Sequence, residues 1–183
     1  MNYYQDFFVE LKRIASNKSV YERIIEHIDY LAKKSSMTEQ DIFNGAEINI
    51  DPIYIIDCID NINAILAAQG IPEQRHKESG LLYNTLSLID RGINELEGWC
   101  SEEKGHLIAK FILSKKLYRG VEIGIYGGRS IVPAAAALRE LGKGEIYGIE
   151  AWNPQVAITN KTSELNDEWW ANLNFYPIKE SFF

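Results

Sequence analysis

The sequence has little that suits an oxidising compartment or a nucleic-acid partner. Only 2 of its 183 residues are cysteines, and Cys58 and Cys100 lie far apart with no CxxC motif. Neither a disulfide framework nor a zinc site is therefore expected. Lysine and arginine total 19 against 26 acidic residues, which gives a net charge of −7. Since nucleic-acid-binding proteins usually carry a basic face, we expect no nucleic acid as partner.

Long hydrophobic runs are also missing. No apolar stretch approaches the roughly 20 residues that a transmembrane helix needs. The N-terminus, MNYYQDFFVELKRIASNKS, is interrupted by acidic residues and has no small-residue cleavage site, so it does not resemble a signal peptide. We therefore expect a cytoplasmic protein with no membrane partner. Hydrophobic residues make up 46% of the chain, which is enough for a buried core.

The first part of the chain, residues 1–97, has the spacing of amphipathic helices. Apolar residues recur every three or four positions, as on one face of a helix. Asp51, Pro52 and Gly70 fit the N-cap, the first turn and the stop of the third helix. We expect a helical bundle or cap here. The predicted apolar stripes are Tyr4, Phe7, Phe8, Leu11 and Ile14; Val20, Ile24, Ile28 and Leu31; Ile55, Ile59, Ile62 and Leu66; and Leu82, Leu86, Ile89, Ile93 and Leu96.

After Gly98 the pattern changes to alternating helices and strands. A helix capped by Ser101 precedes a strand at 118–125 and a glycine turn; then come a helix through SIVPAAAALREL and the strand EIYGI. This is a β-α-β unit, the smallest part of a doubly wound nucleotide-binding sheet. We therefore predict an α/β fold, with a helical N-terminal region followed by a Rossmann-like cofactor-binding region, whole or truncated, at 98–183.

The turn after the first strand belongs to the segment VEIGIYGGRS. It lacks the Gly-Lys-Ser/Thr of a phosphate-binding P-loop. It also fails the Gly-x-Gly-x-x-Gly fingerprint of dinucleotide-binding proteins, because Tyr126 and Arg129 replace the second and third glycines when the frame starts at Gly124. The frame that is present is Glu-x-Gly-x-x-x-Gly, from Glu122 to Gly128.

The charge of this turn favours a cationic ligand that lacks phosphate. Glu122 would repel a pyrophosphate, whereas S-adenosylmethionine carries a sulfonium and an ammonium group. The ligand's carboxylate can be bound by backbone N–H groups, Ser130 and Arg129, and glycines such as Gly127 allow close approach of the backbone. Glu150 ends the second strand about 20 residues after the turn, the spacing at which an acid binds ribose hydroxyls.

At this point the sequence resembles a known family. VEIGIYGGRS, followed by IYGIEAW and a later WW, is similar to motifs of the class I S-adenosylmethionine-dependent methyltransferases, and GWCSEEKGHLIAKFI resembles their lead-in helix. The resemblance covers about residues 98–176. It implies a methyltransferase with a small-molecule acceptor, in which Glu150 binds the ribose and Trp152 lies beside the adenine. The sequence is most similar to the branch of the family whose first motif is Glu-x-Gly-x-x-x-Gly-Arg-Ser, and that branch more often has aspartate at the position of Glu150. The matching turn residues are Glu122, Gly124, Tyr126, Gly128 and Ser130.

Two questions stay open at the level of sequence. The family builds a sheet of about seven strands, whereas two parallel strands alone are not a stable sheet. The N-terminal helices, a second chain such as another copy in a homo-oligomer, or a longer natural chain would have to complete it. No catalytic residue or metal ligand is therefore assigned. The alternative function is a non-catalytic binding or interaction module, with a helical half that recruits a partner; an NAD-dependent oxidoreductase ranks behind both.

The remaining polar and aromatic candidates are interpreted as structural. His27, His76 and His106 do not cluster in the sequence, so each is expected on the surface or with its hydrogen bonds satisfied. Asp57 and Asp60 are expected on a solvated helix face. The pair Trp169-Trp170 is expected to pack under the C-terminal segment, and a lid over a substrate is the alternative.

Overall fold

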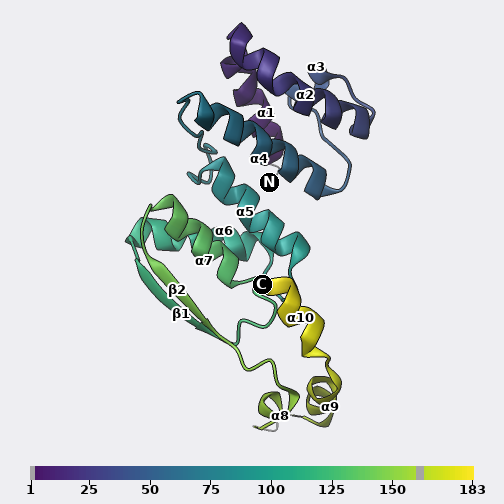
Figure 1. Ribbon diagram of the computed structural model, residues 1–183, viewed down its shortest axis with the longest axis vertical. Coiled ribbons are helices and arrows are strands. Elements are labelled where there is room, and N and C mark those ends of the chain that lie inside the picture. The colour runs from purple at the N-terminus through teal and green to yellow at the C-terminus, as the bar shows by residue number, and fades with distance from the viewer. Residues whose placement is uncertain (1–2, 160–162) are drawn as a thin grey trace. The chain divides into compact units, whose positions relative to one another are not determined.

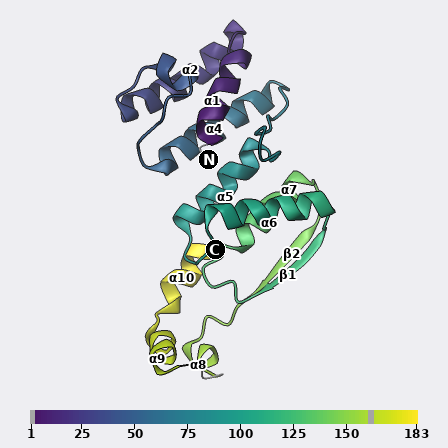
Figure 2. The same cartoon turned by 180° about the vertical axis from the view of Figure 1, so that it is seen from behind.

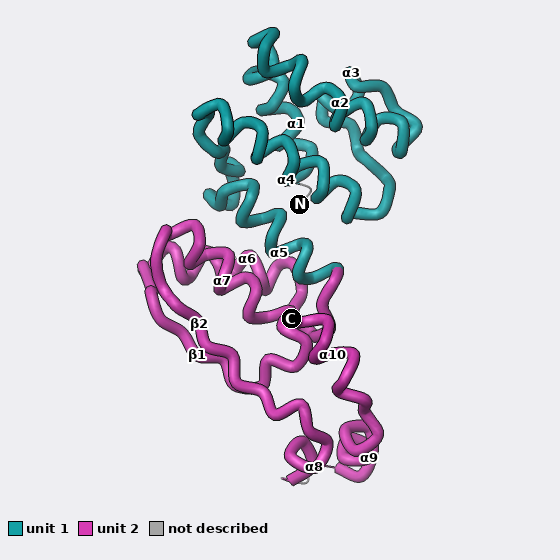
Figure 3. Tube along the Cα trace, viewed as in Figure 1, with its two compact units in different colours: residues 1–94 teal, residues 95–183 magenta. Residues whose placement is uncertain are grey.

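The computed structural model describes residues 3–159 and 163–183, and the chain divides into two compact units, 1–94 and 95–183 (Figures 1 and 3). Most of the described residues are helical, and the strands among them form one two-stranded parallel sheet. The predicted α/β class is confirmed in this coarse sense only: helices accompany a small parallel sheet. In the described ranges, no helix combines the length and the apolar composition that crossing a bilayer requires.

Unit 1 is built from helices that bury most residues of the predicted stripes; Tyr4, Ile14, Leu82 and Ile93 are only half-buried. The side chains of Phe7, Phe8 and Leu11 are buried, and so are the predicted stripes of the second and third helices. These faces pack on one another, with α2 against both α3 and α4 and with α1 against α3. The helix bounds are α1 (Tyr3–Ile14), α2 (Lys18–Ser35), α3 (Glu39–Phe43), α4 (Pro52–Ala68) and α5 (Tyr83–Glu95), whose final residue falls in unit 2.

The predicted signals at the two ends of α4 are confirmed. The Asp51 side chain accepts a hydrogen bond from the N–H of Ile53, Pro52 occupies the first turn, and Gly70 follows the helix with φ +68°. The short α3 was not predicted. Its signal is a capping box, in which Thr38 and Asp41 bond each other's backbone N–H groups.

The fourth predicted helix begins later than expected. Residues 75–82 form a turn closed by a bridge between Arg75 and Leu82, so Leu82, the first residue of the predicted stripe, precedes α5, which starts at Tyr83. The expected solvated position of Asp57 and Asp60 is confirmed, since their side chains are 52% and 30% exposed, but their partner was not predicted. Arg91 donates to both carboxylates, at 2.8 Å and 2.9 Å, and thereby joins α5 to α4.

Unit 2 contains the predicted β-α-β unit. Strands β1 and β2 pair in parallel from Arg119↔Glu145 to Ile123↔Ile149. Helix α7 connects them and packs against both β2 and α6. Ser101 caps α6 as expected, since its hydroxyl accepts from the N–H of Lys104. The bounds are α6 (Glu102–Lys115), β1 (Arg119–Ile123), α7 (Ile131–Glu140), β2 (Glu145–Ile149), α8 (Pro154–Ala157), α9 (Glu164–Asn172) and α10 (Phe175–Phe182).

The two helices α6 and α7 lie on one side of the sheet (Figures 1 and 2). Small buried residues such as Ala109, Ala134 and Ala137 line their packing surface, which allows close approach of the helices. After β2, the described segments form the helices α8, α9 and α10 and no third strand. The sheet therefore has two strands in the described part of the chain.

Candidate functional site

The carboxyl ends of β1 and β2 bring the predicted site residues together. The glycine turn leaves β1 at Gly124, whose N–H donates to the carbonyl of Ile149 at 2.8 Å. Glu150 follows β2 directly, and Glu122 lies near the end of β1. Ligands of parallel α/β sheets bind at this edge. Glu122, Gly124 and Glu150, which are separated in the sequence, therefore lie at the same end of the sheet.

Glu150 forms the structural link between the two strand ends. One carboxylate oxygen accepts from the N–H of Tyr126 at 2.9 Å, and the other accepts from the N–H groups of Ala151 at 2.8 Å and Trp152 at 3.3 Å. The sequence did not indicate this role. A carboxylate has about four acceptor positions, so after these three bonds Glu150 retains the capacity to accept a ligand hydroxyl.

Glu122 and Ser130 bond each other directly. The Ser130 hydroxyl donates to the carboxylate of Glu122 across the turn. For this reason Ser130 stands at the start of α7 without capping it through its side chain. The sequence interpretation assigned Ser130 to a ligand carboxylate. In the structure its proton is directed at Glu122, and its oxygen lone pairs are left to accept from an N–H or O–H donor.

The three glycines of the turn are required for three different reasons. At Gly124, φ is +79° and no described atom lies within 4 Å of the position that a Cβ would occupy. At Gly127, a Cβ would lie 2.6 Å from the carbonyl oxygen of Glu97. At Gly128, φ is +92° and a Cβ would collide with the ring of Phe182. Of the three, Gly124 is therefore the one that offers its backbone to a ligand.

Arg129 has a structural partner that the sequence interpretation did not include. Its Nε donates to the carbonyl of Leu96 at 2.6 Å. A Cβ added to Gly98, where φ is +143°, would lie 2.9 Å from the Cβ of Arg129. Arg129 thus ties the segment before α6 to the glycine turn, and a guanidinium still has further N–H groups for other acceptors.

Two residues of the site have left-handed backbone conformations, which residues other than glycine rarely adopt. Tyr126 has φ 54° and Trp152 has φ 42°. They bond each other, since the indole N–H of Trp152 donates to the carbonyl of Tyr126 at 2.8 Å. Backbone strain of this kind is kept only where the surroundings fix it, and it is common at ligand sites. Burial, assisted by the charge of Glu97, raises the pKa of the Tyr126 hydroxyl above its ordinary value.

An aromatic cluster surrounds Tyr126. Its ring lies 5.0 Å from that of Trp99 and 5.9 Å from that of Trp170. Trp170 also stacks on Phe175 at 6.0 Å and contacts Trp169 at 4.7 Å. Trp170 thus packs as expected, whereas Trp169 stays 46% exposed. Trp99 was missed, and it remains 69% exposed while it contacts Tyr126.

Helix α10 packs beside the turn. The Phe182 ring lies on Gly128, and the ring of Trp152 lies 6.2 Å from Phe182 and 5.8 Å from Phe183. Lys179 lies over Trp152, with its Nζ 5.7 Å from the ring centroid. The Trp152 ring, expected beside an adenine, thus contacts α10. A ligand at this edge has to approach from the side of Gly124.

In unit 1, a serine, a histidine and an aspartate are hydrogen-bonded in a chain, as in the catalytic triad of hydrolases. The buried ring of His76 has one nitrogen 3.0 Å from Asp6 and the other 2.9 Å from the hydroxyl of Ser79. However, the Ser79 hydroxyl also accepts from the N–H of Leu81, and the N–H of Gly80 is bonded to the carbonyl of His76. The N–H groups of Gly80 and Leu81 therefore bond other atoms of the same turn, as in a structural turn. Both ring nitrogens of His76 have hydrogen-bond partners, as expected.

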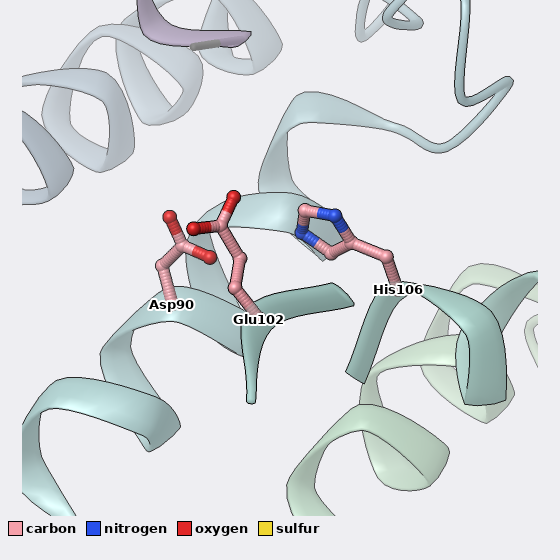
Figure 4. Close-up of side chains that lie close together, drawn as sticks. All are labelled: Asp90, Glu102 and His106. Atoms are coloured by element: carbon pink, nitrogen blue, oxygen red, sulfur yellow. The ribbon is translucent and has the colours of Figure 1, made fainter. Parts of the chain in front are cut away.

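Among the described residues, the candidates for metal ligation include acidic and histidine side chains of α6. Figure 4 labels Glu102 and His106, which lie one turn apart on α6, and Asp90 of α5. Asp90 belongs to unit 1, so only Glu102 and His106 share a unit. Two ligands on one helical turn are too few for a structural metal ion such as zinc, so no metal site is assigned.

Comparison with known proteins adds no family to this geometry. No family model matches the chain, and neither a curated protein nor a solved structure is significantly similar to it. The resemblance to methyltransferases therefore depends on the short motifs around Glu122 and Glu150 alone.

Proposed function

We propose that unit 2 binds S-adenosylmethionine and forms the cofactor-binding part of a methyltransferase that acts on a small molecule. The observation that carries this proposal is the position of two acidic residues at the carboxyl edge of one parallel sheet: Glu122 lies near the end of β1, two residues before the exposed Gly124, and Glu150 follows β2 directly. Two acidic groups at this edge favour a cationic ligand over a pyrophosphate.

Glu150, Glu122 and Gly124 have different roles in this binding. Glu150 accepts a ribose hydroxyl with its remaining acceptor capacity while it keeps the turn in place. Glu122, held by Ser130, supplies negative charge that attracts the ammonium and the sulfonium. The open side of Gly124 lets the backbone approach the ligand. The sulfonium supplies an electrophilic methyl group, so the work of the protein is to orient the acceptor and exclude water.

Thermal unfolding with added ligand tests the proposal. S-adenosylhomocysteine bound only to the folded state has to raise the melting temperature, by an amount that grows with its concentration. NAD and ADP at the same concentrations should leave it unchanged. If only NAD or ADP stabilises the protein, or if S-adenosylhomocysteine has no effect at saturating concentration, the proposal is wrong.

A pair of variants locates the binding. Glu150→Gln should weaken S-adenosylhomocysteine binding about tenfold or more, in line with the loss of a hydrogen bond to a charged group. Glu145→Gln removes a carboxylate from the opposite end of the same strand and should leave affinity unchanged. Equal affinities for both variants would remove the assignment of Glu150 to the ribose.

A second candidate function is a binding module that does not transfer the methyl group. It is favoured by the small size of the sheet, which has two strands in the described residues. The two functions differ in one measurement. A methyltransferase converts S-adenosylmethionine to S-adenosylhomocysteine when amine, hydroxyl or thiol acceptors are supplied, whereas the module binds both and converts neither.

A further inference from the structure

The face of the sheet that points away from α6 and α7 is bare and apolar. Alternate residues of each strand point to this face. Its apolar residues are Val121 and Ile123 of β1 and Tyr147 and Ile149 of β2, whose exposed fractions range from 55% to 81%. No described element of unit 2 lies over this side of the strands in Figures 1 and 2. Parallel sheets occur almost only with both faces covered, so a covering surface is required.

The pairing register arranges this face in rows across the two strands. Val121 pairs with Tyr147, and Ile123 pairs with Ile149. At the amino end of the sheet, Arg119 pairs with Glu145, and their charged groups lie 3.8 Å apart. The face therefore has one row of opposite charges, with the positive charge on β1 and the negative charge on β2, and then two apolar rows.

We propose that this face binds the same face of a second copy of the chain, with a two-fold axis that runs parallel to the strands between the two sheets. Such an axis places β1 of each copy opposite β2 of the other at the same level. The apolar rows then cover one another, and Arg119 of each copy lies opposite Glu145 of the other. The surface is thus complementary to itself, as an isologous interface requires.

The charged row selects this axis over the other face-to-face arrangement. A two-fold axis perpendicular to the strands would reverse the second sheet and place Arg119 of one copy against Ile123 of the other. That arrangement removes a charged group from water against an apolar partner, which is costly. The parallel axis avoids this cost, and its cross-chain ion pairs add specificity more than affinity.

The size of the face sets the expected strength of the dimer. Stable protein interfaces bury about 1,200–2,000 Å² in total, and an apolar core of four side chains from each copy is at the small end of such surfaces. We therefore expect a weak dimer whose population changes with concentration. The proposal is independent of the ligand at the carboxyl edge, so failure of one leaves the other in place.

Sedimentation velocity over about a hundredfold range of protein concentration tests the dimer, because mass action must shift its population. We expect the wild type to shift from monomer to dimer and Ile123→Lys to remain monomeric with an unchanged circular dichroism spectrum. Leu165→Lys, at an exposed leucine of α9, is the matched control and should dimerise like the wild type. If the wild type stays monomeric, the proposal is wrong, because another part of the same chain must then cover the face. Dimerisation of Ile123→Lys would also overturn it.

A mixing experiment tests the axis. Arg119→Glu gives copies with two negative charges in the row, and Glu145→Arg gives copies with two positive charges. Each variant alone should dimerise less than the wild type because like charges face each other. An equimolar mixture should form heterodimers, since opposite charges then meet across the interface while the pairs within each chain stay repulsive. If mixing does not restore dimers, the axis parallel to the strands is wrong.

Discussion

The ring of Phe182, in the last turn of α10, lies on the backbone of Gly128 in the glycine turn. The two residues are distant in the sequence, and the contact places an aromatic side chain at the edge where the proposed ligand binds. It also explains why position 128 cannot carry a Cβ, independently of its φ of +92°. The contact makes α10 a part of the candidate site.

Removal of the Phe182 ring should make the turn more accessible. We expect Phe182→Ala to bind S-adenosylhomocysteine about three- to tenfold more tightly, on the order of 1 kcal/mol, because removal of the ring opens the side of Gly128 to a ligand that otherwise approaches only from the side of Gly124. Isothermal titration calorimetry measures the change. Tyr176→Ala, at an exposed tyrosine of the same helix, is the control and should bind like the wild type. Weaker binding by Phe182→Ala would show instead that the ring contacts the bound ligand.

Gly124 should tolerate no side chain in the ligand complex. Gly124→Ala is expected to cost about 1–2 kcal/mol of folding stability, because an L-residue is strained in a left-handed conformation, and also to abolish ligand binding. Gly70→Ala is the matched control: its φ is +68° and the space around it is equally open, but it lies after α4 in unit 1. It should lose similar stability and keep affinity. Urea unfolding and calorimetry measure the two effects, and equal affinities would show that no ligand approaches Gly124.

Both cysteines should be unreactive in the folded protein. Burial raises the pKa of Cys58 to about 12 and also raises the pKa of the buried Cys100 thiol. Because the thiolate is the reactive form, we expect both to react slowly with a chromogenic disulfide at pH 8 and rapidly in denaturant. The raised pKa values mean that the folded state favours the protonated thiols, so stability should fall as pH rises above the ordinary thiol pKa of about 8.5. Rapid reaction of either thiol in the folded protein would contradict the buried positions of the two cysteines.

The His76 contacts should stabilise unit 1 and have no catalytic effect. We expect His76→Ala to lower the free energy of unfolding by about 2–4 kcal/mol, since it removes a buried ring and leaves its partners without their hydrogen bonds. Asp6→Asn should cost about 1 kcal/mol or less, because the Asp6 side chain is 56% exposed. Chemical unfolding followed by circular dichroism measures both. Ester hydrolysis that depends on Ser79 would contradict the structural assignment.

Periodicity and capping were readable from the sequence because they are local. The stripes of α1, α2 and α4 recur at the helical period, and Asp51 and Ser101 bond N–H groups within three positions of themselves. The order β-α-β followed from the glycine turn and the two short apolar runs. The start of α5 was misplaced because the bridge between Arg75 and Leu82 uses residues that fit a helical pattern.

The composition of the candidate site was predicted, but its bonding was not. Glu122, Gly124 and Glu150 were selected by residue type and spacing, and parallel pairing of their strands places them at one edge. The sequence alone therefore determined that these three residues lie at one edge, since helix period, strand alternation and glycine conformation act over a few positions. Only the tertiary structure decided that Ser130 bonds Glu122 and that Phe182 covers Gly128, because such contacts depend on how distant segments pack, which local patterns do not encode.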